Sequence, residues 1–89
     1  MDQNVPDIDP AGPEFVYMVV ADHIAKQIAD GRLQPGARLL GEADMAELYG
    51  IARLTARRAV RELRERGLVL TVQSKGTFVA RSGDKPKSE

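Results

Sequence analysis

The sequence predicts a small, mainly α-helical domain that ends in a β-hairpin. Apolar residues recur at helical spacing in three segments, a glycine follows each segment, and the apolar pattern then changes to a period of two. With 89 residues there is material for one small core, which excludes a second core and a deep substrate cavity. We expect a disordered acidic N-terminal arm (1–13), a folded domain (14–80) and a polar C-terminal tail (81–89).

The first predicted helix runs from Phe15 to about Asp30. Its apolar residues follow the spacing of a helix with one buried face: Tyr17, Val20, Ala21, Ile24, Ala25 and Ile28. Gly31 then supplies the left-handed conformation that ends many helices. His23, the sole histidine, falls on the polar side, so we expect it at the surface, and we expect Tyr17 in the core.

A turn and a second, shorter helix follow. In Leu33–Gly36 a proline fixes φ and the next residue, a glycine, accepts a positive φ, which is typical of a turn. Residues 38–40 are a candidate short strand. The second helix is predicted over Glu42–Tyr49, with Met45 and Leu48 as its buried residues.

The third predicted helix, from about Arg53 to Arg66, begins only three residues after the second one ends. Its inward positions are Ala56, Ala59, Val60 and Leu63. Ala46 allows the two helices to cross closely, Gly50 turns the chain, and Ile51 fills the corner. This spacing predicts a helix-turn-helix.

The end of the folded domain has the period of a β-hairpin. Leu68, Leu70 and Val72 alternate with the residues between them, Ser74–Gly76 forms a turn, and residues 77–79 return along the first strand. We expect Phe78, in the returning strand, to be a core residue. A hairpin directly after a helix-turn-helix is a wing, so the predicted fold class is a winged helix-turn-helix: mainly α, with three helices and a small β-hairpin.

The net charge of zero conceals a strong segregation of charge along the chain. Residues 1–30 hold six acidic residues and one basic residue, whereas residues 51–89 hold ten basic and four acidic residues. The net charge is therefore −5 in the first segment, −1 in residues 31–50 and +6 in the last. Segregation of this kind is typical of an anion-binding face, and the alternative is an ordinary solvated helix face.

Six arginines fall within the third predicted helix. Four of them recur at spacings of four, four and three and so predict one outward stripe: Arg53, Arg57, Arg61 and Arg64. Three pairs at a spacing of four, Arg58–Glu62, Arg61–Glu65 and Glu62–Arg66, are expected to stabilise the helix by a few tenths of a kcal/mol each.

Arg53 and Arg57 have no carboxylate at such a spacing, and they lie in the first turns, where the helix dipole disfavours a cation. We interpret them as nucleic-acid contacts, because a forked guanidinium suits a phosphate or a guanine edge, with Thr55 as a hydroxyl donor between them. Lys75 and Gly76 at the hairpin tip are a candidate second contact, since glycine lets the backbone approach a groove. The alternative there is a common turn with a surface lysine.

Six short segments occur in one order over Phe15–Val79: Ile28–Leu33, Pro35–Leu39, Glu42–Ile51, Arg53 with Thr55 and Arg57, Glu65–Val69 and Lys75–Val79. Together they resemble the DNA-binding domain of GntR-type bacterial transcription regulators. The resemblance implies that the start of the third helix enters the major groove and that the wing tip reaches the minor groove. The implied DNA-binding residues are Arg53, Leu54, Thr55, Arg57, Arg58, Arg61, Lys75 and Gly76.

The chain departs from the family pattern at several positions. Gly41 and Ala52 stand where hydroxyl residues usually cap the second and third helices, Leu54 replaces a frequent threonine, and Ala43 replaces an arginine. Fewer phosphate contacts imply weaker binding with a shallower salt dependence. Members of the family also continue into a larger ligand-binding domain, so we expect either an isolated DNA-binding domain or a small stand-alone regulator.

We therefore expect a sequence-specific regulator of transcription, a repressor, that binds a palindromic operator in double-stranded DNA as a homodimer. The alternative is a winged-helix protein-interaction module that does not touch DNA. An enzyme, a cofactor and a metal site are not expected, because the chain has no cysteine, one histidine and no glycine-rich phosphate loop. No apolar run is long enough for a membrane span, so we expect a cytoplasmic, nucleoid-associated protein. The sequence leaves any small-molecule effector open.

Overall fold

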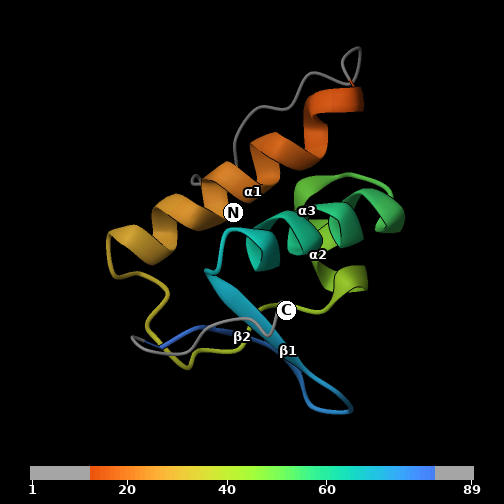
Figure 1. Cartoon of the computed structure of the whole chain (residues 1–89). Coiled ribbons are helices and arrows are strands. Elements are labelled where there is room, and N and C mark those ends of the chain that lie inside the picture. Colours follow the sequence, from red (N-terminus) through yellow and green to blue (C-terminus); the bar gives the residue numbers. More distant parts are fainter. Residues whose placement is uncertain (1–12, 82–89) are drawn as a thin grey trace.

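The computed structural model describes residues 13–81, which form three helices and one β-hairpin (Figure 1). The helices are α1 (Pro13–Ala29), α2 (Glu42–Tyr49) and α3 (Arg53–Glu65), and the antiparallel strands are β1 (Val69–Val72) and β2 (Gly76–Val79). The predicted winged helix-turn-helix is confirmed. Helix α1 begins two residues earlier than predicted, at Pro13, where the missing N–H costs nothing. The predicted arm (1–13) and tail (81–89) lie, except for residues 13 and 81, outside the described residues.

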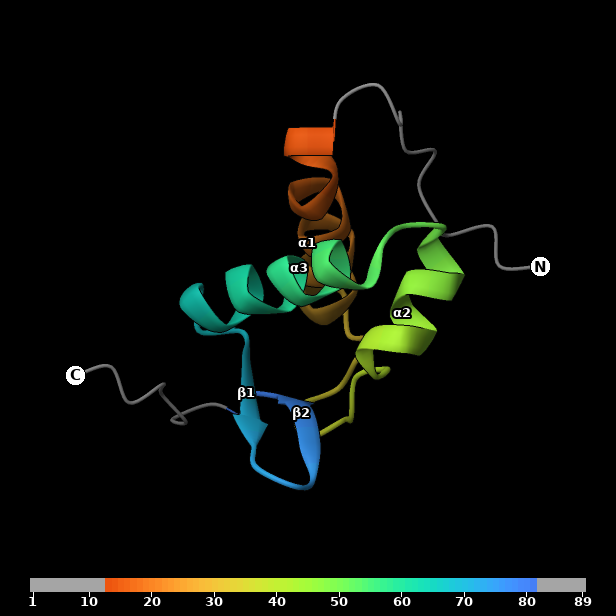
Figure 2. The ribbon, with the colours of Figure 1, turned by 90° about the vertical axis from the view of Figure 1, so that its right-hand side faces the viewer.

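Helix α3 is the centre of the fold, because α1, α2 and β1 all pack against it. Figure 2 shows α3 crossing in front of α1, with α2 on one side and the hairpin below. All four predicted inward residues of α3 are buried: Ala56, Ala59, Val60 and Leu63. They share one apolar core with residues from the other elements, among them Val20, Ile24, Leu39, Met45, Val69 and Val79. Three alanines facing this core, Ala46, Ala56 and Ala59, keep the crossing helices close.

The corner of the helix-turn-helix has the predicted chemistry. Gly50 adopts a left-handed conformation with φ of +69°, and the Ile51 N–H donates a hydrogen bond of 3.0 Å to the carbonyl of Ala46. Ile51 packs partly buried against the core. Neither α2 nor α3 has a side-chain cap, because Gly41 and Ala52 occupy their N-cap positions. The predicted lack of a side-chain cap is therefore confirmed for both helices.

Two predictions about the first two helices are wrong. Leu48 is 42% exposed, and Tyr49 takes the buried position beside Met45. The phenol can be buried because its oxygen lies 2.7 Å from Nδ1 of His23, with which it shares a hydrogen bond. His23 is therefore a half-buried link between α1 and α2, and it does not lie freely at the surface.

The segment before α2 attaches to the hairpin but does not form a full strand. Arg38 makes one isolated antiparallel bridge to Phe78, and the Leu39 N–H donates a hydrogen bond of 2.8 Å to the carbonyl of Thr77. Phe78 is half-buried and lies outside the buried core, whereas Val79 next to it is buried, so the prediction for Phe78 is wrong. These backbone contacts place residues 38 and 39 beside β2.

Candidate nucleic-acid interface

Helix α3 carries a group of exposed cations. Arg53, Arg57, Arg58 and Arg61 are all exposed. Leu54, in the first turn, is 68% exposed, the highest value among the large apolar side chains of the described residues. Thr55 is half-buried against the turn. The structure thus places the six predicted α3 residues on or beside one exposed, cationic surface.

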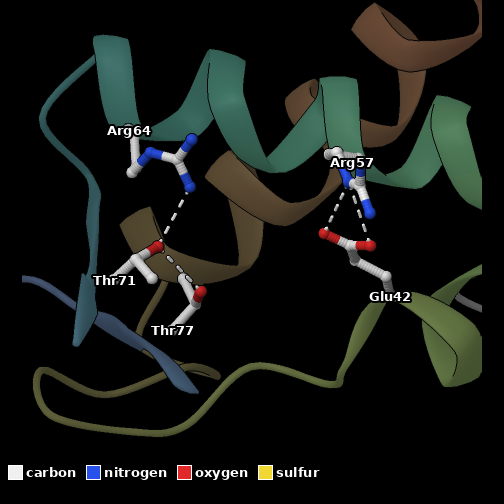
Figure 3. Close-up of polar contacts among 5 residues, drawn as sticks. All are labelled: Glu42, Arg57, Arg64, Thr71 and Thr77. Carbon is white, nitrogen blue, oxygen red and sulfur yellow. Dashed lines mark hydrogen bonds and ion pairs between the residues drawn. The ribbon is translucent and has the colours of Figure 1, made fainter. Parts of the chain in front are cut away.

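Arg57 has a carboxylate partner, contrary to the prediction. Its Nε donates to both carboxylate oxygens of Glu42, at 3.1 and 3.2 Å (Figure 3). The hydrogen bond, with a smaller contribution from the charge of Glu42, raises the pKa of Arg57 above its usual value. Glu42 is the first residue of α2, so a search for partners along α3 alone could not find it. In the described part of the chain, the two terminal nitrogens of Arg57 have no partner and form an open fork.

Arg53 has no carboxylate partner among the described residues, which agrees with the prediction. It is the first residue of α3, directly after Ala52, whose backbone is extended and whose side chain cannot cap the helix. The first N–H groups of α3 therefore have no side-chain acceptor. An uncapped helix start with an exposed guanidinium is suited to a phosphate oxygen.

Neither Arg58 nor Arg61 forms its predicted ion pair along α3 within the described residues. Arg58 does not pair with Glu62, because its guanidinium lies 4.1 Å from the centre of the Tyr17 ring in α1. Tyr17 is therefore half-buried against the core with one face covered by an arginine. Arg61 has no carboxylate partner within residues 13–81, so the predicted pair with Glu65 is absent too.

The pair at the end of α3 forms as predicted and is extended by α1. Arg66 Nε donates to Glu62 at 2.9 Å, and its Nη2 donates to Asp22 of α1 at 2.8 Å. Both hydrogen bonds raise the pKa of Arg66, the one to Glu62 more. Arg66 thereby fastens the end of α3 to α1.

Arg64 belongs to the hairpin side of the molecule and does not continue an outward stripe. Its Nη1 donates to Oγ1 of Thr71 at 3.0 Å, and that hydroxyl lies 3.0 Å from Oγ1 of Thr77 (Figure 3). A hollow of about 240 Å³ lies between α3, the start of α2 and the hairpin; we refer to it as the α3–hairpin hollow. Its polar lining includes Arg38, Glu42, Arg57, Arg64, Thr71 and Thr77. Helical periodicity missed this feature, because three separate segments build it.

The predicted tip residues lie at the end of the hairpin. Lys75 is exposed, and its N–H closes the turn with a hydrogen bond of 2.9 Å to the carbonyl of Val72. Gly76 has φ of +124°, and a Cβ at this position would lie 2.8 Å from Nε of Arg38. The positive φ is a reason within the fold itself for a glycine here, and the role of Gly76 toward a nucleic acid stays a prediction.

The fold and this cationic surface define a class of protein, the winged helix-turn-helix domains. Residues 16–79 match the family described as "Bacterial regulatory proteins, gntR family". The chain belongs to this family, and the resemblance seen in its sequence is confirmed.

Named relatives agree with the family. The chain is 36% identical over 83 residues to the "HTH-type transcriptional repressor NagR" of Bacillus subtilis, which covers 93% of the chain and 32% of that protein. It is 38% identical over 68 residues to the "Mannosyl-D-glycerate transport/metabolism system repressor MngR" of Escherichia coli, covering 76% of the chain and 28% of that protein. The chain thus spans about a third of the length of these relatives.

Solved structures share the fold. A transcriptional antiterminator from Listeria monocytogenes superposes with a TM-score of 0.78 at 30% identity, covering 94% of this chain and 63% of the other. AraR(DBD) in complex with operator ORR3 superposes with a TM-score of 0.68 at 34% identity, covering 72% of this chain and 77% of the other. The second neighbour shows that a domain similar to this one binds operator DNA.

Residues 13–81 contain neither a metal-binding cluster nor a helix able to span a membrane. In that range no three histidine, cysteine, aspartate or glutamate residues gather in a way that could hold a metal ion. None of the described helices has the length and apolar character of a membrane span.

Proposed function

We propose that the chain is the DNA-binding part of a transcription repressor and recognises a specific sequence in double-stranded DNA through α3 and the hairpin. The observation that carries this proposal is the exposed cationic surface of α3, which stands uncovered between α2 and the hairpin in a domain of the GntR family. The operator complex of the similar AraR domain supports it. An enzymatic role has no support in the geometry, and a regulator of this kind would work at the nucleoid, in the cytoplasm.

The start of α3 is the part we assign to base recognition. In helix-turn-helix proteins, the first residues of the second helix contact base edges in the major groove. Arg53 and the open fork of Arg57 suit the O6 and N7 atoms of guanine, and the exposed methyl groups of Leu54 suit the 5-methyl group of thymine. Glu42 has a positioning role here, because it holds Nε and leaves the two terminal nitrogens to the DNA.

The remaining predicted residues are assigned to the phosphate backbone. Thr55, Arg58 and Arg61 lie beside the base-reading residues on α3, and Lys75 and Gly76 form the hairpin tip. Phosphate contacts fix the position and register of a protein on the duplex without reading its sequence. A single small domain makes few such contacts. We therefore propose that two copies bind as a homodimer on two half-sites, so that the operator is palindromic.

The proposal is tested with duplexes enriched from a random-sequence library by the 89-residue chain. We expect one enriched sequence with two related halves, and an affinity that falls steeply with salt. Arg53→Gln and Arg57→Gln should each lower the affinity for this duplex by roughly tenfold to a hundredfold, because each bidentate base contact contributes roughly 1 to 3 kcal/mol.

Arg32→Gln is the matched control, since Arg32 is an exposed arginine in the loop after α1. Enrichment of no sequence, or equal binding by the Arg53, Arg57 and Arg32 variants, would contradict the proposal. Retention of a protein partner in the absence of any DNA binding would favour the winged-helix interaction module instead.

A further inference from the structure

The α3–hairpin hollow is polar, cationic and built from three separate segments. Arg64 comes from α3, Arg38 from the loop before α2, and Thr71 and Thr77 face each other across the hairpin. Arg57 also lines the hollow, and its charge is balanced by Glu42. The two remaining guanidiniums, of Arg38 and Arg64, have no carboxylate partner in the described part of the chain. The hollow therefore has two uncompensated positive charges.

Part of the hollow is ordered before any ligand binds: the backbone of Arg38 and the side chains of Arg64, Thr71 and Thr77. The backbone of Arg38 is bridged to Phe78, and its guanidinium lies against Gly76, where a side chain would collide with it. Arg64 is oriented by its hydrogen bond to Thr71, which in turn shares a hydrogen bond with Thr77 (Figure 3). Within residues 13–81, only one Arg64 nitrogen is used in this way. Its other N–H groups and the Thr77 hydroxyl are donors that an oxygen-rich anion could accept from.

The position of the hollow indicates which anion it meets. An α-helix with its side chains, about 10 to 12 Å across, fills the major groove, which is about 12 Å wide and has a phosphate backbone along each border. The elements beside α3 must then face these two backbones. The hairpin and residues 38–42 flank α3 on one side, and the hollow opens between them.

We propose that Arg38, Arg64 and Thr77 bind a phosphodiester group of the DNA backbone in the α3–hairpin hollow. This inference rests on the proposed function and adds a site that the helical pattern of the sequence does not contain. A guanidinium pair from two segments suits a tetrahedral anion with two exposed oxygens. The contact fixes the distance between α3 and the hairpin on the duplex, so it sets the register with which the base-reading residues enter the groove.

The test compares Arg38→Gln and Arg64→Gln with the control Arg32→Gln, which removes the same charge outside the hollow. Binding to the duplex enriched from the random library is measured across a salt series, and thermal unfolding verifies that each variant folds. Each hollow variant should lower the affinity about tenfold and reduce the salt slope by about one, whereas Arg32→Gln should leave both unchanged. If the salt slopes of Arg38→Gln and Arg64→Gln both equal that of Arg32→Gln, the inference is overturned.

A second measurement identifies the phosphate. Single neutral methylphosphonates are placed along the enriched duplex, and the one facing the hollow should weaken wild-type binding about tenfold while having no further effect on Arg64→Gln. If every methylphosphonate weakens the binding of Arg64→Gln as much as it weakens the binding of the wild type, the two effects are independent and the inference is overturned. If inorganic phosphate binds saturably at the hollow while no methylphosphonate shows this dependence on Arg64, the site belongs to a free anion, and the inference is also overturned. If no duplex binds at all, the proposed function fails; if duplex binds and only these variants behave as the control does, this inference alone fails.

Discussion

The two ends of α3 carry the same residue type in opposite situations. At its start, Arg53 is exposed and has no carboxylate partner among the described residues, and Arg57 keeps its terminal nitrogens open. At its end, Arg66 is held by Glu62 and by Asp22 of α1. Arg53 and Arg57 are available to a ligand, whereas Arg66 uses its N–H donors within the fold. The difference shows that a row of arginines on a helix is not one functional unit, because neighbouring elements decide which guanidiniums are free.

The largest expected effect on DNA binding is at the start of α3, its open end, where Arg53 and Arg57 lie. Arg57→Ala should weaken binding to the enriched duplex by about 2 kcal/mol, or about thirtyfold, and relax its preference at one base pair. It should leave thermal stability almost unchanged, because the pair with Glu42 is exposed. Competition binding with single-base variants of the duplex measures both effects. Equal losses on every sequence would assign Arg57 to the backbone and not to a base.

At the end of α3, its closed end, where Arg66 lies, we expect a loss of stability and almost no loss of DNA binding. Arg66→Ala should destabilise the fold by about 1 kcal/mol, because it removes two ion pairs, and lower Tm by roughly 4 to 8 °C. Affinity for DNA should stay within about twofold. The raised pKa of Arg66 means that this stabilisation is present at neutral pH and is lost only as the pH rises above the usual arginine pKa. Calorimetry from about pH 6 to about pH 9 should therefore show the same difference in stability between the wild type and Arg66→Ala throughout.

Glu42→Gln tests whether the open end depends on a positioning residue. The amide keeps one acceptor for Arg57 Nε but loses the charge that holds it, so the fork should become more mobile. We expect affinity for unrelated duplexes to rise about twofold, because a negative charge near the phosphates is removed, and affinity for the enriched duplex to fall about twofold. The ratio of the two affinities is the readout. An unchanged ratio would show that Glu42 does not orient Arg57.

The smallest effect is expected at Arg58, which is neither free like Arg53 nor held by carboxylates like Arg66. Its guanidinium covers the Tyr17 ring, an interaction of about 0.5 to 1 kcal/mol at an exposed site. Arg58→Gln should therefore weaken DNA binding less than Arg61→Gln, since Arg61 has no partner in the described structure. Tyr17→Leu in the chain that keeps Arg58 should free this arginine and increase the affinity for DNA slightly. A larger loss for Arg58→Gln than for Arg61→Gln would place Arg58 at the open end.

Most of the fold could be predicted from the sequence. The bounds of α2 agree with the prediction, those of α3 differ by one residue, and the turn at Gly50 and the hairpin lie where predicted. These features depend on apolar spacing and on glycine, which act over a few residues along the chain. The errors concern which neighbour a side chain meets: Tyr49 and not Leu48 is buried, and His23 is a link between helices.

The sequence by itself therefore determined the family, the order of helices and hairpin, and the concentration of positive charge on α3. Only the tertiary structure decided how that charge is used. Glu42 reaches Arg57 over fifteen residues, Asp22 reaches Arg66 over forty-four, and Arg38 and Arg64 meet at one hollow. The physical reason is range: helix formation follows local spacing, whereas an ion pair requires only that two charged atoms lie within a few ångströms, wherever their residues stand in the chain.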